Sequence, residues 1–342
     1  MSTPFVLITG ATGFIGAEVL HQALAKGYRT RVTVRKEEQA AAIKARHPDA
    51  GDRLEIIVVP VLDNVAALTE ALSGGVDYIL HIASPMPQPG LDLQTGYIDP
   101  AVHSTVAVLD AAKAFPSVKR VIITSSTLAL APLDYSTQPG FVIREGSNRS
   151  LQVDPSVPVP DGPAAEGIKY HISKILAHRA TLDWIDAAKA KNEKIPEVVT
   201  VHPYFVIGHD RTHPAKGGPA HGVNQIYLAS LQSPFPYVPS ALVDVRDVAT
   251  VHVAALAASS QLLEGQGRDV TEVIAKGPRV TWEEIVAFVK ENYPSFTVNQ
   301  TTSGPFTEPT TSDTTRAQRD FGVPQFHPAL DSVAALLDQN TE

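Results

Sequence analysis

The chain begins with a pattern that few folds can accommodate: an apolar run, a loop with three glycines and a stretch of helical periodicity. Residues 5–8 are all apolar, which is typical of a strand buried on both faces of a parallel sheet. Gly10, Gly13 and Gly16 follow, and apolar residues then recur every four positions before Gly27. A second strand is predicted over 30–34. The order therefore predicts a strand, a glycine loop, a helix and a parallel strand.

In this context the glycine loop predicts a site for a dinucleotide. Glycines let the backbone turn tightly and approach a pyrophosphate, and the helix that follows offers free N–H groups and a partial positive charge. The alternative is a glycine-rich turn that binds nothing. The strands on either side of the loop and the helix after it favour the binding site.

The residue that closes the second strand indicates which dinucleotide binds. An acidic residue there binds the 2′-hydroxyl of NAD, whereas an arginine can bind the 2′-phosphate of NADP through two hydrogen bonds. The strand ends in Val34-Arg35-Lys36, and no acidic residue occurs before Glu37. Arg35 therefore favours NADP(H); the alternative is a solvated charge at the end of a strand.

The next hundred residues alternate between predicted strands and predicted helices. Strands are expected over 54–59, 76–82 and 121–123, and helices over 65–72 and 101–115. Regular alternation of this kind predicts an α/β fold with a doubly wound parallel sheet, that is, a Rossmann fold.

Two segments are expected at the carboxyl edge of this sheet, which is where open α/β sheets bind ligands. Asp63 follows the third strand and either meets the adenine amino group or caps the next helix. Ala83 and Ser84 open a proline-broken loop that follows the fourth strand.

The later part of the chain predicts a smaller second lobe. Residues 131–167 and 209–239 are irregular, and long loops of this kind are usually lids or binding loops. Helices are expected over 282–290 and near 330–337. We expect residues 1–205, together with about 240–262, to form an NADP-binding Rossmann domain. Residues 206–239 and 263–342 are expected to form a substrate-binding lobe.

Composition excludes several classes of function. With 36 acidic and 28 basic residues the formal charge is −8, which lacks the basic footprint of a nucleic-acid binder. The absence of cysteine excludes disulfides, a thiol nucleophile and cysteine-ligated metals. His209, His213 and His221 fall in a segment rich in Pro and Gly, so a loop is expected there and not a metal site. No apolar run reaches about 18 residues, so a soluble, cytoplasmic protein is expected.

Two groups of polar residues carry the predicted chemistry. Tyr170 and Lys174 lie one turn apart on a helix predicted over 168–188, on a face distinct from its apolar stripe. A nearby ammonium lowers the pKa of a phenol from about 10, which suits a general acid–base group; the alternative is an incidental pair on a surface helix. The hydroxyl residues 124–127 follow the fifth strand, where one of them either binds a carbonyl oxygen or only satisfies the backbone.

Together these motifs resemble the extended short-chain dehydrogenases/reductases. The loop Thr9-Gly10-x-x-Gly13-x-x-Gly16, the hydroxyl cluster and Tyr170-x-x-x-Lys174 occur in the order of that family. The resemblance is closest to the branch of dihydroflavonol reductases, cinnamoyl-CoA reductases and fungal aldehyde/ketone reductases. Supporting segments are residues 32–35, 81–86, 202–208, 243–249 and 313–322.

The resemblance implies roles for individual residues. Tyr170 is expected to donate a proton, Lys174 to hold the nicotinamide ribose and tune the tyrosine, and Ser126, or else Ser125, to orient the substrate. No metal is implied. The expected contacts to NADPH are Thr9, Gly10, Thr12, Gly13, Phe14, Ile15, Gly16, Arg35, Asp63, Ala83, Ser84, Tyr170, Lys174, Pro203 and Val206.

The function implied is the NADPH-dependent reduction of a small, largely neutral ketone or aldehyde by a monomer or homodimer with no nucleic-acid or membrane partner. The alternatives are a sugar-nucleotide epimerase or dehydratase of the same superfamily and a regulator that senses NADP without catalysis. Arg35 disfavours tightly held NAD, and the presence of both Tyr170 and Lys174 disfavours the regulator. The expected pocket lining comprises segments 131–167 and 209–239, the latter with Tyr227, Phe235 and Tyr237, together with Met86, Tyr204 and Phe205.

Overall fold

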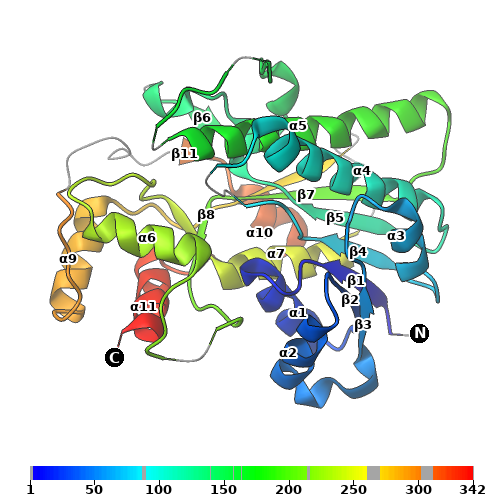
Figure 1. Cartoon of the computed structure of the whole chain (residues 1–342), viewed down its shortest axis with the longest axis horizontal. Helices are drawn as coiled ribbons and strands as arrows, with labels where there is room; N and C mark the ends of the chain where they lie inside the picture. Colours follow the sequence, from blue (N-terminus) through cyan, green and yellow to red (C-terminus); the bar gives the residue numbers. More distant parts are fainter. Residues whose placement is uncertain are drawn as a thin grey trace.

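The computed structural model describes residues 3–86, 90–138, 140–156, 158–162, 164–213, 216–259, 270–301 and 311–341. They form a central sheet covered by helices on both faces, with a smaller lobe at one end (Figure 1).

Seven parallel strands make up the central sheet, in the order β10-β7-β5-β4-β1-β2-β3. β1 pairs with β2 on one side and with β4 on the other, so the direction of winding reverses between β1 and β4. In such sheets the carboxyl ends of these two strands form the crevice that binds ligands. The predicted doubly wound fold is confirmed. The strands are β1 Phe5–Thr9, β2 Arg29–Val34, β3 Leu54–Val58, β4 Tyr78–His81, β5 Arg120–Thr124, β7 Glu197–Pro203 and β10 Thr271–Ala275.

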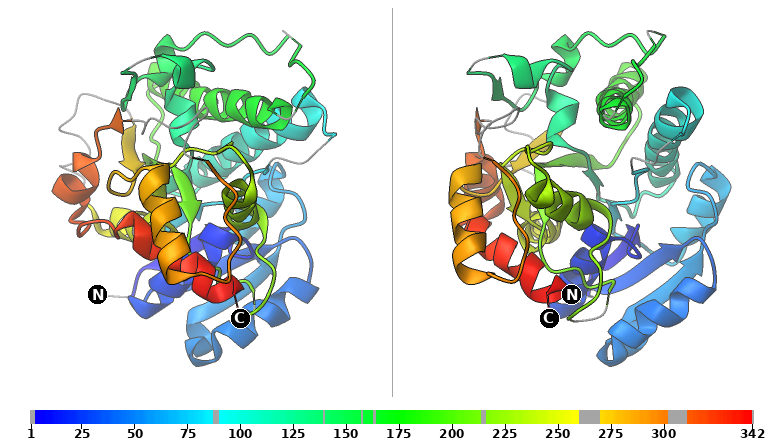
Figure 2. Two further views of the ribbon diagram at one scale, coloured as in Figure 1. Left: turned by 90° about the vertical axis from the view of Figure 1, so that its left-hand side faces the viewer. Right: turned by 60° about the vertical axis from the view of Figure 1, so that its left-hand side comes forward.

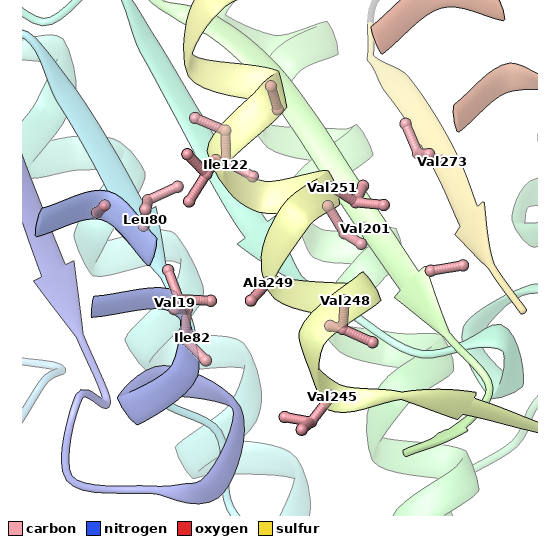
Figure 3. Packing of buried hydrophobic residues seen from close by; sticks show 14 of the residues in the cluster. Val19, Leu80, Ile82, Ile122, Val201, Val245, Val248, Ala249, Val251 and Val273 are labelled. Carbon is pink, nitrogen blue, oxygen red and sulfur yellow. The ribbon is translucent and has the colours of Figure 1, made fainter. Parts of the chain in front are cut away.

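Helices cover each face of the sheet because each carries one apolar stripe. Figure 3 shows how Val245, Val248 and Ala249 of α7 lie over the sheet beside Val201 of β7, with Val19 of α1 nearby. No helix in the described ranges is long and apolar enough to cross a membrane. One face carries α1 Phe14–Ala25, α2 Glu38–Arg46, α7 Val245–Ala257 and α10 Thr315–Phe321; the other carries α3 Val65–Ala71, α4 Asp99–Lys113 and α5 Ala165–Ala190.

The lobe has an apolar core of its own, in which Trp282 is buried and stacks on Tyr227 with ring centres 5.3 Å apart. The helices predicted near 282–290 and 330–337 are confirmed, whereas α6 falls in a block predicted to be irregular. Figure 2 shows α9 and α11, in orange and red, at this end of the molecule. The lobe elements are β8 Phe205–Ile207, β9 Leu242–Asp244, α6 Gly222–Gln232, α9 Trp282–Asn292 and α11 Ala329–Asn340.

Part of the segment predicted to lie in the lobe belongs to the main body instead. β10 pairs along its length with β7, and α10 packs against both α7 and β10, where it buries Phe321. The strand begins with Thr271 and Glu272, so it lacks the purely apolar run that marks β1 in the sequence. The prediction that 263–342 belongs wholly to the lobe is therefore wrong for β10 and α10.

The described part of segment 131–167 is largely irregular, as predicted, up to α5, which begins at Ala165, but it is bonded to its surroundings. The buried Asn148 amide donates to the carbonyl oxygens of Ala129, at 2.8 Å, and of Ile175 in α5, at 3.0 Å. The Glu145 carboxylate forms an ion pair of 2.7 Å with Arg316 of α10. Strand β6 (Val142–Ile143) pairs with β11 (Thr311–Ser312).

The short helical turns in the described part of the chain are η1 Pro48–Arg53, η2 Leu93–Ile98, η3 Thr127–Leu130, η4 Tyr135–Thr137 and η5 Asn148–Ser150.

Candidate active site

Two of the three loop glycines are required by the fold itself. β1 ends at Thr9, and Gly10 then adopts a φ of +80°, which a side chain would strain. A Cβ on Gly10 would lie 2.6 Å from the backbone nitrogen of Ala83, just beyond β4. A Cβ on Gly16 would overlap with the carbonyl oxygen of Gly10. These glycines therefore allow α1 and the ends of β1 and β4 to approach closely.

Gly13 is different, because nothing in the described part of the chain requires a glycine there. Its φ of −95° and ψ of 172° suit any residue, and a Cβ would meet only the Gly10 oxygen at 3.5 Å. Gly13 caps α1 without a side-chain hydrogen bond to the helix, and the first turn contains no acidic residue. The N-terminal end of α1, with Phe14 and Ile15 after Gly13 and Thr12 before it, is thus open to an anion and fits a pyrophosphate.

Thr9 holds the two strand ends together and is fully buried. Its Oγ1 lies 2.9 Å from Nδ1 of His81 and accepts a hydrogen bond from the Ala83 N–H at 3.3 Å. Burial, together with the nearby charge of Lys174, lowers the pKa of His81 to about 4, so this histidine is neutral at physiological pH. The side chain of Thr9 thus joins the carboxyl ends of β1 and β4, which form the crevice.

The two residues predicted to recognise the adenosine half are both exposed. Arg35 directly follows β2, and its side chain makes no ion pair with the described part of the chain, so its guanidinium can receive a phosphate. Asp63 follows β3, but the cap of α3 is Asn64, whose Oδ1 accepts from the Ala67 N–H at 3.1 Å. The interpretation of Asp63 as a helix cap is therefore wrong, and the contact with adenine stays a prediction.

α5 brings Tyr170 and Lys174 to one face, as the spacing predicts. The Lys174 Nζ lies 5.1 Å from the centre of the Tyr170 ring and donates a hydrogen bond of 2.7 Å to the Ser84 Oγ. Because Ser84 lies just beyond β4, the lysine connects the helix to the crevice at which the sheet order reverses.

The electrostatics of this pair differ from the expectation. Burial raises the pKa of the Tyr170 phenol above its usual value and lowers the pKa of the Lys174 ammonium to about 8. The prediction of a lowered pKa for Tyr170 is wrong, because the loss of hydration on burial dominates over the nearby ammonium, which faces the ring and bonds Ser84. A phenol that keeps its proton at neutral pH is suited to donate it.

Both candidate serines lie where β5 meets α5. The Ser125 N–H donates to the Val201 carbonyl oxygen at 2.7 Å, and Ser125 lines the same small cavity as Lys174. The Ser126 Oγ accepts from the Leu128 N–H at 3.2 Å and so caps η3, which packs against α5. Which of the two hydroxyls serves a substrate stays open.

The family is decided by comparison with known proteins. The model of the NAD dependent epimerase/dehydratase family matches residues 6–270. The chain belongs to this family. The extended short-chain dehydrogenase/reductase resemblance is thereby confirmed.

The relatives of this family member include reductases. It is 30% identical over 332 residues to ketoreductase sphI of Aspergillus fumigatus. This alignment covers 94% of this chain and 93% of the relative. It is 29% identical over 293 residues to cinnamoyl-CoA reductase CAD2 of Medicago truncatula, covering 85% and 81%. Its fold matches yeast methylglyoxal/isovaleraldehyde reductase Gre2 complexed with NADPH, with a TM-score of 0.80, 21% identity and 98% of each chain covered.

Pro203 and Val206 of this epimerase/dehydratase family member lie close together in the chain, at the end of β7 and on β8. Pro203 ends β7, and its carbonyl oxygen accepts from the Thr127 Oγ1 at 3.3 Å. Val206 lies on β8 and is 7% exposed. Their contact with a nicotinamide stays a prediction.

The predicted aromatic lining of the substrate pocket is wrong for two residues. Tyr227 is fully buried against Trp282, and Tyr204 is 7% exposed, so both belong to the apolar interior and not to an open pocket. Met86, Phe235 and Tyr237 are 44%, 57% and 47% exposed, and their contact with a substrate stays a prediction. The aromatic residues near 204 and 227 serve the packing of the lobe.

A buried polar cluster behind Lys174 was not predictable from sequence. The Nε2 of His178, one turn beyond Lys174, lies 2.8 Å from the Glu272 Oε1 on β10. His202 donates from Nδ1 to the Ser126 carbonyl oxygen at 2.9 Å, so its buried ring is hydrogen-bonded within the protein. The only local signal was the position of His178 eight residues after Tyr170, because Glu272 is distant in sequence.

Proposed function

We propose that this protein is an NADPH-dependent reductase of small, largely neutral ketones or aldehydes. The observation that carries the proposal is the pairing of the protonated Tyr170 phenol with Lys174, which bonds Ser84 at the crevice beside the glycine loop. The similarity to ketoreductase sphI and the NADPH bound by the structurally similar Gre2 support it.

The residues at the crevice fit NADPH. The open end of α1 at Gly13 would hold the pyrophosphate, the exposed Arg35 the 2′-phosphate, and Lys174 the nicotinamide ribose. When bound, NADPH supplies the hydride that reduces the carbonyl carbon.

The protein's own groups would manage the charge on the carbonyl oxygen. The Tyr170 hydroxyl donates its proton to that oxygen as negative charge develops there, and the hydroxyl of Ser126 or Ser125 donates a second hydrogen bond. The Lys174 ammonium stabilises the phenolate that remains. Because burial raises the pKa of Tyr170, the proton stays on the phenol until a substrate is reduced.

The rival activities have less support. Dehydratases of this superfamily place a carboxylate beside the catalytic hydroxyl, whereas Thr127, Leu128 and Ala129 follow Ser126. Among the residues that the structure describes, no carboxylate lines the cavity at Lys174. A regulator that only senses NADP would not need the Tyr170–Lys174 pair.

The direct test is consumption of NADPH with a panel of aliphatic and aromatic ketones and aldehydes. We expect steady loss of NADPH absorbance with at least one member and formation of the corresponding alcohol. Tight NADPH binding without turnover of any carbonyl would support the regulator instead, and turnover of a nucleotide sugar without net loss of NADPH would support the epimerase.

Substituting Arg35 tests the choice of cofactor. Arg35→Ala should weaken NADPH binding at least about tenfold, because a charge-assisted hydrogen bond contributes roughly 1.5–3 kcal/mol, and it should leave NADH binding nearly unchanged. Titration calorimetry with both cofactors measures this. Lys44→Ala removes an equal charge from the exposed face of α2 and should change neither affinity. Equal weakening of NADPH and NADH by Arg35→Ala would contradict the phosphate contact.

The pKa of Lys174 predicts a pH profile. Above pH 8, where Lys174 loses its proton, kcat/KM for NADPH should fall by about tenfold per pH unit, since this parameter reports groups of the free enzyme. In Lys174→Arg the value should be lower overall but should lack this falling limb, because a guanidinium stays charged to a pH above about 12. Initial rates between neutral and alkaline pH provide the measurement, and an identical limb in both proteins would assign it to another group.

A further inference from the structure

Beneath Lys174 lies a buried pair of side chains that the proposed mechanism does not use. Tyr170, Lys174 and His178 follow one another at intervals of four residues, so they form a row along one face of α5. The side chains of His178 and Glu272 are 0% and 2% exposed and are joined by the hydrogen bond of 2.8 Å. Glu272 also accepts from the N–H of Gly146, so the catalytic helix, strand β10 and segment 131–167 meet at one carboxylate.

The bond to Glu272 fixes which nitrogen of His178 carries a proton. A carboxylate only accepts, so the Nε2 of His178 donates, and in the neutral ring Nδ1 keeps its lone pair. That Nδ1 is buried and has no hydrogen-bond partner among the residues that the structure describes. A buried polar atom in this state is rare and commonly marks a position for an ordered water molecule.

His178 and Lys174 line the same cavity. Its volume is about 20 Å³, and Ser84, Thr124 and Ser125 also line it. A polar cavity of roughly 10–15 Å³ is enough to hold one water molecule. An ammonium has three N–H donors, and the Lys174 ammonium gives one to Ser84. The cavity thus has hydrogen-bond donors on one wall and an acceptor on another.

We propose that His178, oriented by Glu272, is a positioning residue for Lys174, and that its Nδ1 accepts a hydrogen bond from the lysine ammonium through a water molecule in this cavity. This contact favours the protonated form of Lys174 and holds its ammonium beside Tyr170 and Ser84, where the proposed reduction needs it. The role in catalysis rests on the proposed function, whereas the contact itself does not.

The same side chains also have the composition of a metal site, since ligand atoms of His178, His202 and Glu272 lie within 4.8 Å of one another. Hydrogen bonds already occupy most of these atoms. His202 uses Nδ1 for the Ser126 carbonyl oxygen and Nε2 for the Thr200 hydroxyl, at 2.9 Å each. We therefore assign a hydrogen-bonded network in which the Nδ1 of His178 remains for the cavity.

The other titratable groups around Lys174 hold one protonation state near neutral pH. On α5 itself, burial raises the pKa of Tyr170. Burial lowers the pKa of His81 on β4 to about 4 and that of His202 on β7 to about 3. Burial alone would raise the pKa of Glu272 on β10, but the bonds from His178 and Gly146, together with the nearby His202, bring it down to about 2. A shift in the titration of Lys174 after substitution of His178 is thus attributable to His178.

The test is an NMR titration of the protein without cofactor, with carbon-13 in its lysine side chains; the Lys174 signal is the one that Lys174→Arg lacks. His178→Gln keeps a donor for Glu272 but loses the acceptor at the position of Nδ1. We expect it to lower the midpoint of the Lys174 titration by about one pH unit, the size of one hydrogen bond. His178→Asn retains an acceptor near that position and should have a midpoint close to that of the wild type.

Thr181→Val is the matched control, because Thr181 lines the same cavity but its hydroxyl bonds the Ala177 carbonyl oxygen within α5. It should leave the midpoint unchanged. If His178→Gln does not fold, as judged by thermal melting, Glu272→Gln replaces it and should lower the midpoint, because an amide, unlike a carboxylate, can also donate to Nε2 and so no longer fixes the ring proton there. A wild-type midpoint in a folded His178→Gln or Glu272→Gln protein would overturn the inference. A lowered midpoint in a protein that reduces no carbonyl would refute the proposed function alone.

Discussion

Tyr170→Phe should lower kcat for carbonyl reduction by about 10²–10⁴-fold, the usual contribution of a general acid. The substitution removes one oxygen atom and keeps the ring against which Lys174 lies. NADPH affinity should therefore stay close to that of the wild type. Steady-state kinetics with the best carbonyl of the panel, together with calorimetric titration of NADPH, separate the two effects.

Tyr293→Phe is the matched control for this prediction. Tyr293 lies in the lobe, where its hydroxyl donates to Asp338 at 2.8 Å, so its loss removes a phenolic oxygen far from the crevice. It should leave kcat within a few-fold of the wild type. If Tyr170→Phe also retained such a value, another group would have to be the proton donor.

Gly13→Ala should weaken NADPH binding by about 10²-fold without weakening the fold. The backbone at Gly13 suits alanine and a Cβ there has room within the protein, so the free energy of unfolding should change by less than about 0.5 kcal/mol. The added methyl group would keep the pyrophosphate away from the N–H groups of α1, and one or two charge-assisted hydrogen bonds account for about 3 kcal/mol.

Two other glycines provide the comparison. Gly16→Ala should disrupt the fold, because its Cβ would overlap with the Gly10 carbonyl oxygen. Gly167→Ala lies at a helical position with open space around it, so it should not lower stability and should leave NADPH affinity unchanged. Calorimetric affinities and thermal melts of the three variants test the assignment, and normal NADPH affinity in Gly13→Ala would place the pyrophosphate elsewhere.

The parts of the site that are local in sequence were predictable. The glycine loop and the Tyr170–Lys174 pair each depend on spacing within one or two turns, so the sheet edge and the helix face followed from pattern alone. The strands with continuous apolar runs were predictable for the same reason. β10, which begins with Thr271 and Glu272, lacked that signal.

What could not be predicted depends on residues far apart in the chain. The pKa of Tyr170 is set by how deeply α5 is buried, and spacing does not report burial. Tyr227 faces the core of the lobe because Trp282 packs on it from a distant helix. The bond between His178 and Glu272 likewise needs the long-range pairing of β10 with β7.

The most direct test of the account is a crystal structure of the protein with NADPH. We predict the pyrophosphate at the N-terminal end of α1 beside Gly13 and the 2′-phosphate on Arg35. The reactive carbon of the nicotinamide should lie beside Tyr170 and Lys174, with room for a carbonyl group next to the Tyr170 hydroxyl. A nicotinamide bound away from Tyr170 and Lys174, or a dinucleotide outside the crevice between β1 and β4, would contradict it.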